Sequence, residues 1–338
     1  MSEANRVWRL RQRPFGDITE DVLSFEEESI PEPGDGEFLF RLNYLSLDPT
    51  NRVWMSDMDQ YMPPVALDDP MRGFVCGTVV KSHHPDYAEG AVVSGLGVWA
   101  DYQIGTPQLV RPLGDTGPIP VDEAFSAFAL VGPTAYLLLL EIGDPKEGET
   151  VVVSAAAGAV GSIVGQIAKI KGCRVVGLAG SKEKCAWIQD DLGFDEAINY
   201  RTEDVPKALA AACPDGIDVY FDNVGGEILD ACLKLMNFRG RIPTCGLISQ
   251  YNATEPVPGP YNYAMILMQR LRVEGLIPVL DLPERCPEAI AALGQWMAEG
   301  KIKVRTEIVD GLENALSTVK KLFSGANTGK LMIRVKDL

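Results

Sequence analysis

The chain has 338 residues, 46% of them hydrophobic and 23% charged, which is an ordinary globular composition and is long enough for two domains. Its net charge of −16 argues against nucleic acid as a partner, because an acidic surface repels phosphate backbones. No apolar run approaches the roughly 20 residues of a membrane span, and the N-terminal segment lacks the apolar core of a secretory signal, so we expect no membrane partner.

Cysteine and histidine are placed in a way that argues against a metal site. The seven cysteines are scattered and none pairs at short spacing, which favours free thiols in a reducing, cytoplasmic compartment. The two histidines, His83 and His84, are adjacent and would point to opposite faces of a strand. Because the usual nitrogen and sulfur ligands of zinc form no recognisable group, we expect no metal.

The segment before residue 120 favours a small β-rich domain. Apolar runs such as "GEFLFRLNYLSL" (36–47) and "FVCGTVVKS" (74–82) are separated by Gly, Pro and Asp turns. The last forty residues return to this mixed style. We expect a helix over "LENALSTVKKLFSG" (312–325) and a closing strand over "KLMIRV" (330–335).

The middle of the chain alternates short apolar runs with segments of helical periodicity. We expect strands at 150–156, 174–180, 196–200, 217–224 and 241–248, and helices at 159–172, 182–193, 203–213 and 227–236. This alternation predicts a parallel, doubly wound sheet with right-handed crossovers.

A glycine-rich loop follows the first of these strands. Its form is Ala-x-x-Gly-x-x-Gly, built from Ala155, Gly158 and Gly161. Gly158 would let the backbone approach a pyrophosphate, and the helix that follows offers unpaired N–H groups. Gly158, Gly161, Gly165 and Ala168 share one helix face, which can lie close on the sheet. We therefore predict a dinucleotide site that includes Ala155, Gly158, Val160 and Gly161.

The end of the second strand of this unit indicates which dinucleotide binds. NAD-binding units usually place an acid here for the ribose hydroxyls, but this chain has Ser181, Lys182 and Lys184. Hydrogen bonds to a charged group are worth about 1.5–3 kcal/mol each, so one or two of them favour NADPH about ten- to several-hundred-fold. The alternative interpretation is a lysine-rich, solvated helix start.

Four stretches together resemble one enzyme family. They are "SAAAGAVGSIVGQIAKIKGC" (154–173), "DVYFDNVGGE" (218–227), "GLISQYN" (246–252) and "GANTGKLMI" (325–333). They are similar to the zinc-free branch of the medium-chain dehydrogenase/reductase superfamily, nearest to the NADPH-dependent alkenal double-bond reductases, which include the prostaglandin reductases. The resemblance runs from "LSLDP" (45–49) to residue 333.

This resemblance implies an α/β fold with two domains. A Rossmann NADPH-binding domain would occupy residues 127–298, and a GroES-like catalytic domain would be formed by both chain ends, 1–126 and 299–338. The resemblance also implies a homodimer and NADPH as cofactor, without a metal.

The resemblance assigns roles to individual residues. Ser181, Lys184 and Tyr200 would lie near the 2′-phosphate, Asn223 by the nicotinamide and Asn327 near the pyrophosphate or ribose. The residues alone leave simpler roles open, because Tyr200 ends a strand and both asparagines precede a glycine turn.

The expected substrate pocket departs from the family pattern. Where the family often has "DPYMR", this chain has "DPTNR" (48–52), so Thr50 and Asn51 replace an aromatic residue and its neighbour. We place Thr50, Asn51 and Trp54 in the pocket, with Met55 and Tyr61 as alternatives for its wall.

Without a metal or a nearby histidine, alcohol oxidation has no evident base, whereas reduction of an activated C=C bond needs only hydride and a donor for the developing enolate oxygen. Tyr251, which the resemblance places at the substrate, suits that donor role; a tyrosine packed on its own turn is the simpler alternative.

We therefore predict an NADPH-dependent reductase of enals and enones. An NADPH-dependent quinone oxidoreductase and a non-catalytic NADPH-binding sensor are the alternatives.

Overall fold

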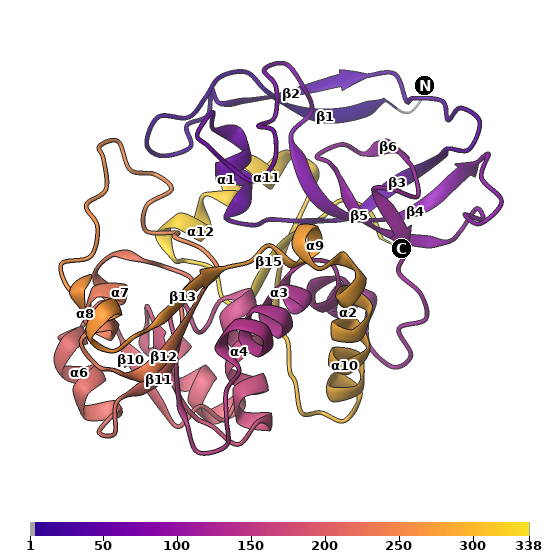
Figure 1. The fold of residues 1–338 in the computed structure, drawn as a ribbon. Coiled ribbons are helices and arrows are strands. Elements are labelled where there is room, and N and C mark those ends of the chain that lie inside the picture. Colours follow the sequence, from indigo (N-terminus) through magenta and orange to yellow (C-terminus); the bar gives the residue numbers. More distant parts are fainter. Residues whose placement is uncertain (1–3, 338) are drawn as a thin grey trace. The chain divides into compact units, whose positions relative to one another are not determined.

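The computed structural model describes residues 4–337, and the chain divides into two compact units. The first unit joins both chain ends, Met1–Phe125 and Thr306–Leu338, and the second unit is Ser126–Arg305 (Figure 1). The first unit is rich in β-strands, whereas the second alternates strands with helices around a parallel sheet. The predicted fold class is therefore confirmed.

Within the described residues, the second unit is built on a six-stranded sheet whose strands all pair in parallel. The strands are β8 (Thr150–Val153), β9 (Arg174–Ala179), β10 (Glu196–Asn199), β11 (Ile217–Phe221), β12 (Met236–Thr244) and β13 (Arg272–Gly275). Their spatial order is β10-β9-β8-β11-β12-β13, so the winding reverses between β8 and β11. Ligands of doubly wound sheets lie beyond the carboxyl ends of the strands at such a reversal.

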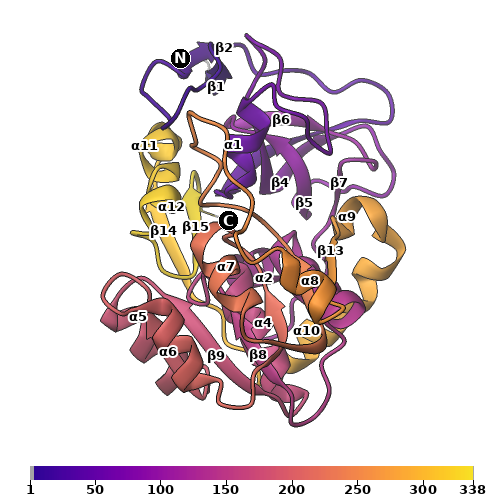
Figure 2. The same ribbon diagram turned by 60° about the vertical axis from the view of Figure 1, so that its left-hand side comes forward.

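Helices cover the two faces of this sheet. They are α3 (Val131–Leu137), α4 (Ala159–Ile170), α5 (Lys182–Ala186), α6 (Val205–Ala212), α7 (Gly226–Leu233), α8 (Ala264–Met268), α9 (Pro278–Asp281) and α10 (Cys286–Ala298), with π turns η1 (Leu138–Gly143) and η2 (Trp187–Asp191) and a 3₁₀ turn η3 (Pro283–Arg285). Helix α5 packs against β9 and β10, and α6 packs against β10 (Figure 2). Val151 and Val153 belong to one buried cluster and Val152 to another, because successive side chains of a strand point to opposite faces.

The first unit is built on a mainly antiparallel sheet of order β14-β15-β3-β4-β5-β7, with β6 paired to β3 and a separate β1-β2 hairpin. The strands are β1 (Asn5–Leu10), β2 (Leu23–Glu28), β3 (Phe38–Ser46), β4 (Arg72–Ser82), β5 (Val92–Val98), β6 (Tyr102–Gly105), β7 (Val110–Pro112), β14 (Thr306–Asp310) and β15 (Lys330–Arg334). The helices are α1 (Thr50–Met55), α11 (Ala315–Val319) and α12 (Lys321–Ser324), preceded by a 3₁₀ turn η4 (Leu312–Asn314), while α2 (Val121–Phe128) crosses the boundary between the units. Since β15 pairs with β3, both chain ends share one sheet.

The predicted strands and helices are confirmed in type and order, with differences in their bounds. The strand expected at 241–248 runs from Met236 to Thr244, so Met236, expected at the end of a helix, begins a strand. The strand expected at 150–156 ends at Val153, because the chain turns at Ala155, whose φ is +48°. The helix expected at 182–193 changes from α5 into the π turn η2 before it stops at Gly193. The helix expected at 312–325 is divided into η4, α11 and α12.

No single helix within residues 4–337 is long and apolar enough to cross a membrane. Helix α2 and the helical segment Val131–Gly143, which are joined by a bend, reach the required length and composition only when they are taken together. Leu137, Leu138 and Leu139 of that pair are buried in the core of the second unit.

Candidate functional site

The loop between β8 and α4 has the tight backbone expected of a dinucleotide loop. Ala155 adopts a left-handed conformation, and the Gly158 amide donates to the Ala155 carbonyl at 2.9 Å. A Cβ on Gly161 would lie 2.4 Å from that same carbonyl oxygen, so only glycine lets the helix begin here. A Cβ on Gly158 would meet, within 4 Å, only the Ala155 oxygen at 3.1 Å. The loop itself thus requires Gly161 more strictly than Gly158, which leaves Gly158 available for close approach of a ligand.

The small residues along α4 pack against an aromatic ring that the sequence did not reveal. A Cβ on Gly165 would lie 1.9 Å from Cζ of Phe194. The same ring approaches Gly177 of β9, where an added Cβ would be 2.8 Å from its Cδ1. Ala168 is fully buried, and Val160 is partly buried against the same core. The expected close packing of this helix face is therefore achieved through Phe194.

The carboxyl ends of β9 and β10 bring the predicted phosphate-binding residues together. Ser181 caps α5, because its hydroxyl accepts a hydrogen bond from the Lys184 amide at 3.2 Å. The Tyr200 amide donates to the Ala179 carbonyl at 3.1 Å. The Tyr200 hydroxyl lies over Gly180, where an added Cβ would be 2.7 Å from it. Ser181 and Tyr200 thus flank the end of one strand.

Arg201 is a third cation at this strand end, and the sequence analysis missed it. Its Nε would lie 3.3 Å from a Cβ on Gly180, so its side chain passes beside that glycine together with Tyr200. Arg201 directly follows Tyr200 where β10 ends, but it is the pairing of β10 with β9 that brings it to Gly180. Lys182 and Lys184, on the first turn of α5, supply the other two positive charges.

Asn223 connects the end of β11 to the glycine loop. Its amide Nδ2 donates to the Ser154 carbonyl at 2.7 Å, and its backbone N–H donates to the Ser154 hydroxyl at 2.9 Å. Both bonds fix the residue that precedes Ala155. Asn223 is partly buried beside this loop, at the strand reversal where a dinucleotide would bind.

Asp222 beside it is a buried carboxyl that organises the same turn. Its Oδ1 accepts from the Gly225 amide at 2.8 Å, the Val224 amide at 3.0 Å and the Tyr220 hydroxyl at 2.8 Å. Its Oδ2 is buried and has no hydrogen-bond partner among the described residues. Burial raises the pKa of this carboxyl, although the amide donors act in the opposite direction.

Tyr251 lies on the loop that follows β12. Its hydroxyl accepts a hydrogen bond from the Leu247 amide at 3.1 Å. The same loop is tied to the Asn223 turn, since the Ile248 amide donates to the Asn223 carbonyl at 3.3 Å. The structure thus holds Tyr251 on its own turn, as the simpler alternative expects. A hydroxyl that accepts one bond can also donate one, so this geometry is compatible with a donor role.

The predicted substrate residues of the first unit differ in exposure. Asn51 is fully buried, where its side chain accepts from the Asp48 amide and donates to the Arg72 carbonyl at 3.2 Å. Trp54 is 2% exposed and packs near Phe74. Thr50 is half-buried, and its hydroxyl is hydrogen-bonded to that of Tyr61, an exposed residue.

Asn327 lies in the first unit, on the turn between α12 and β15. Its side-chain amide donates to the Gly329 carbonyl at 3.2 Å. Lys330, which follows, is buried in an ion pair with Asp48 of the "LSLDP" segment. The other predicted cofactor residues belong to the second unit.

Two family models match the chain, one in each unit. Residues 6–113 match the N-terminal domain of oxidoreductase, and residues 159–295 match a model described as zinc-binding dehydrogenase. Within residues 4–337 no three His, Cys, Asp or Glu side chains are grouped so that they could hold a metal ion.

Relatives of known name match over almost the whole chain. The NADPH-dependent curcumin reductase of Escherichia coli is 47% identical, over 98% of this chain and 97% of its own. Prostaglandin reductase 1 of Rattus norvegicus is 39% identical over 97% and 98%. The NADP(+)-dependent 2-alkenal reductase of Nicotiana tabacum is 40% identical over 90% and 89%.

Solved structures share the fold. CurA of Vibrio vulnificus in complex with NADPH is 43% identical, superposes with a TM-score of 0.94 and covers 98% of this chain and 100% of its own. The Escherichia coli quinone oxidoreductase, at 24% identity and a TM-score of 0.79, shows the fold alone. With both halves of the chain matched and relatives well above 30% identity over their full length, the chain belongs to the medium-chain dehydrogenase/reductase superfamily, in the zinc-free branch of alkenal and prostaglandin reductases.

Proposed function

We propose that this NADPH-dependent reductase reduces the C=C bond of α,β-unsaturated aldehydes and ketones. The observation that carries the proposal is full-length similarity to proteins named curcumin reductase, prostaglandin reductase 1 and 2-alkenal reductase. The second unit is then the NADPH-binding domain, and the first unit is the catalytic domain.

The carboxyl edge of the second unit fits NADPH. In the loop at Ala155–Gly161, an added Cβ on Gly158 would meet only the Ala155 oxygen within 4 Å, at 3.1 Å, so the rest of that position is open to the approach of a pyrophosphate. Lys182, Lys184 and Arg201 surround the end of β9, and that segment carries no acid between Leu178 and Ser181. A 2′-phosphate is stabilised by such a cluster, whereas an unphosphorylated ribose gains little from it.

Bound NADPH would supply a hydride to the β-carbon of the substrate, and a proton delivered to the α-carbon would complete the saturated product. After the hydride transfer, negative charge develops on the carbonyl oxygen, and we assign the donor that stabilises it to the Oη–H of Tyr251. A phenol is protonated and able to donate at neutral pH. The Leu247 amide, which donates to this Oη, polarises it and fixes its position. Asn223 has a positioning role, because its side chain holds the glycine loop through Ser154.

On the first unit, Thr50 and Tyr61 form the polar part of the proposed substrate surface. The family pattern places a tyrosine at position 50, and here the Thr50 hydroxyl instead bonds the phenol of Tyr61. Tyr61 is 43% exposed, so its ring can contact a bound ligand. We propose that Tyr61 supplies the aromatic hydroxyl that position 50 lacks. Asn51 and Trp54 belong to α1 and are buried, so they anchor this helix in the first unit.

We also propose that the protein is a homodimer joined through β13. This strand is at the edge of the sheet, and all four of its residues are exposed. An exposed edge strand presents unpaired backbone groups, which a second strand can pair. Its sequence Arg272-Val273-Glu274 is self-complementary, because an antiparallel pair centred on Val273 sets each arginine opposite the glutamate of the other copy. Light scattering after size exclusion should give twice the chain mass, and Val273→Pro should give the monomer.

The activity is tested by following NADPH oxidation with a panel of enals, enones and quinones, with every product identified. Formation of the saturated aldehyde or ketone supports the proposal. Turnover of quinones to hydroquinones with no saturated carbonyl product would instead identify a quinone oxidoreductase. Tight NADPH binding without oxidation by any acceptor would identify a non-catalytic binding protein.

A further inference from the structure

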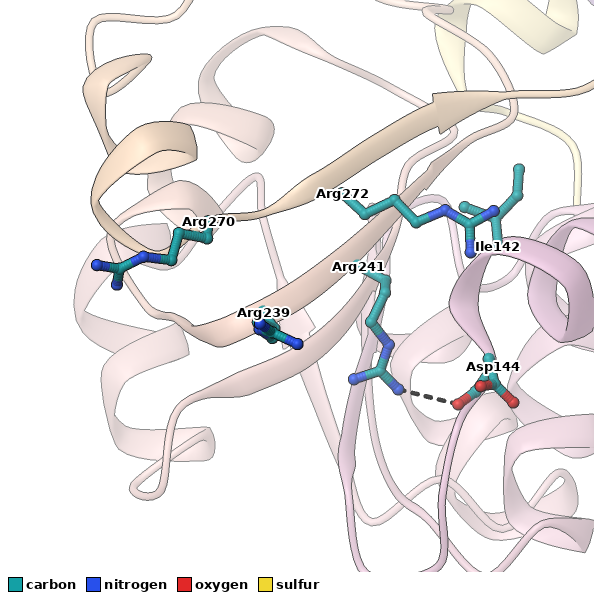
Figure 3. A pocket seen from close by; sticks show the side chains of 6 residues that line it. All are labelled: Ile142, Asp144, Arg239, Arg241, Arg270 and Arg272. Atoms are coloured by element: carbon teal, nitrogen blue, oxygen red, sulfur yellow. Dashed lines mark hydrogen bonds between the residues drawn. The ribbon is translucent and has the colours of Figure 1, made fainter.

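A pocket lined by four arginines lies in the second unit, away from the carboxyl edge of the sheet. Figure 3 shows Arg239 and Arg241 on β12, Arg270 on the turn between α8 and β13, and Arg272 at the start of β13, with Ile142 and Asp144 opposite. The pocket measures about 590 Å³. Four arginines on one surface are unexpected in a chain whose net charge is −16.

The pocket lies near the amino ends of its strands, on the opposite side from the cofactor residues. Arg241 pairs in register with Arg272, the first residue of β13, and the strands run three more residues to Thr244 and Gly275. At about 3.3 Å per residue, this places the pocket roughly 10 Å along the strands from the edge that carries Asn223 and Tyr251. The pocket is therefore distinct from the NADPH site.

The backbone around this pocket is strained. Among the described residues, five that are not glycine have positive φ, and three of them line this one pocket: Asp144 at +39°, Arg239 at +60° and Arg270 at +53°. A fourth, Ala155, belongs to the cofactor loop. Such conformations are disfavoured for residues with a Cβ and concentrate at functional sites. Asp144 closes η1 and Arg270 follows the end of α8, where a left-handed residue ends a helix, whereas Arg239 lies within β12.

Two of the four arginines are neutralised by the protein and two are not. Arg241 is paired with Glu149 and donates to the Gly143 carbonyl at 2.7 Å, and Arg272 is paired with Glu274 at 2.7 Å. In Figure 3 these two point toward Asp144 and Ile142. They form the fixed wall of the pocket.

Arg239 and Arg270 have no carboxylate within 4 Å among residues 4–337. Both are exposed, and both stack on the ring of Phe238, at 5.6 and 5.0 Å from its centroid. Phe238 is itself 57% exposed. The same ring thus makes a cation–π contact with each of the two guanidinium groups. This arrangement keeps two positive charges available to an external anion.

We propose that this arginine pocket binds a compact, multivalent phosphate anion of the diphosphate class. The planar guanidinium fork matches phosphate oxygens with paired hydrogen bonds, and two unpaired forks match an anion with two phosphoryl groups. Arg239 and Arg270 are the binding residues, and Phe238 positions them. The source of the diphosphate is either the free anion or a nucleotide.

The test titrates inorganic pyrophosphate into the full-length protein saturated with NADPH, so that the cofactor site does not contribute. Calorimetry should show a saturable heat of binding for pyrophosphate, larger than the heat measured when chloride is added at equal ionic strength. In the double variant Arg239→Gln/Arg270→Gln, we expect the Kd to rise at least about tenfold, since each lost charge-assisted contact is worth that much. ADP titrated in parallel distinguishes a nucleotide from the free anion, and both should weaken in the double variant.

Arg111→Gln is the matched control, because Arg111 is an exposed arginine on β7 of the first unit. It should leave pyrophosphate binding unchanged. The double variant should keep its Kd for NADPH, which shows that it folds. The proposal is overturned if pyrophosphate does not bind in saturable fashion, or if it binds the folded double variant as tightly as the original protein. Neither outcome bears on the C=C reductase activity, which is measured without pyrophosphate.

Discussion

The Asn223 side chain donates a 2.7 Å hydrogen bond to the backbone carbonyl of Ser154, 69 residues earlier in the chain. This contact crosses the point where the winding of the sheet reverses, and it holds the entrance of the glycine loop. The role of Asn223 that follows is to position the loop, whatever further contact it makes with NADPH.

Asn223→Ala should therefore weaken NADPH binding without unfolding the protein. One hydrogen bond of this kind is worth about 0.5–1.5 kcal/mol, which corresponds to a Kd that rises about three- to tenfold. Fluorescence titration of NADPH measures the change. Asn237→Ala is the control, because Asn237 bonds the Asp215 carbonyl at 3.0 Å and belongs to β12 outside the loop. An unchanged Kd in Asn223→Ala would contradict the positioning role.

Lys184→Glu and Arg201→Glu should each reduce the preference for NADPH. Both remove a positive charge from the end of β9 and introduce a negative one that repels a 2′-phosphate. We expect the ratio of kcat/KM for NADPH to that for NADH to fall at least about tenfold in each variant, mainly through loss of NADPH use. Steady-state kinetics with both cofactors provides the ratio.

Lys207→Glu is the control for these charge reversals. Its side chain is 84% exposed on α6, where it is paired with Asp204, and the same charge change there should leave the ratio unaltered. If Lys184→Glu and Arg201→Glu behave like this control, the phosphate site lies elsewhere.

Much of this site follows from local sequence patterns. The apolar runs predict the order of strands, and Ala155, Gly158 and Gly161 mark the loop, because turn geometry and helix starts depend on neighbours in the chain. Ser181 could be placed at the start of a helix because it lies two residues after the end of a strand. Each of these features depends on residues that lie within about ten positions of one another in the chain, so the sequence alone is enough to predict it.

Features that depend on register could not be found in this way. Arg201 reaches Gly180 only because Asn199 pairs with Ala179. The burial of Asn51 depends on the Arg72 carbonyl, 21 residues away. The arginine pocket joins Asp144 to Arg239 and Arg270, which are about a hundred residues further along the chain, and no local pattern marks such a meeting. In all three cases, the position of the residues depends on contacts between segments that are distant in the chain.

Tyr251→Phe should lower turnover of an enone more than it weakens NADPH binding. The variant removes the proposed donor to the enolate oxygen, and loss of such a donor typically costs about 10²- to 10³-fold in rate. It also leaves the Leu247 amide without this acceptor, so a small loss of thermal stability is expected. Single-turnover kinetics and NADPH titration separate the two effects. Equal losses in rate and in NADPH affinity would show that the tyrosine only supports its loop.

Asp222→Asn should change the pH dependence of stability rather than the fold. Asparagine retains the Oδ1 acceptor that the Gly225 and Val224 amides and the Tyr220 hydroxyl use. Burial raises the pKa of the Asp222 carboxyl, so the folded state binds its proton more tightly than the unfolded state does. The stabilisation from this group is therefore complete below the unfolded pKa of about 3.9 and is lost as the pH rises through the folded value.

Thermal unfolding of the original protein and of Asp222→Asn between pH 4 and pH 8 measures this effect. The stability of the original protein relative to the variant should fall as the pH rises. Asp204→Asn, followed from about pH 5 down to about pH 2, should show the opposite trend, because the Lys207 amide lowers the pKa of the Asp204 carboxyl and its contribution is lost as the pH falls below the unfolded value of about 3.9. Parallel curves for Asp222→Asn and the original protein would mean that the folded state does not raise the pKa of the Asp222 carboxyl.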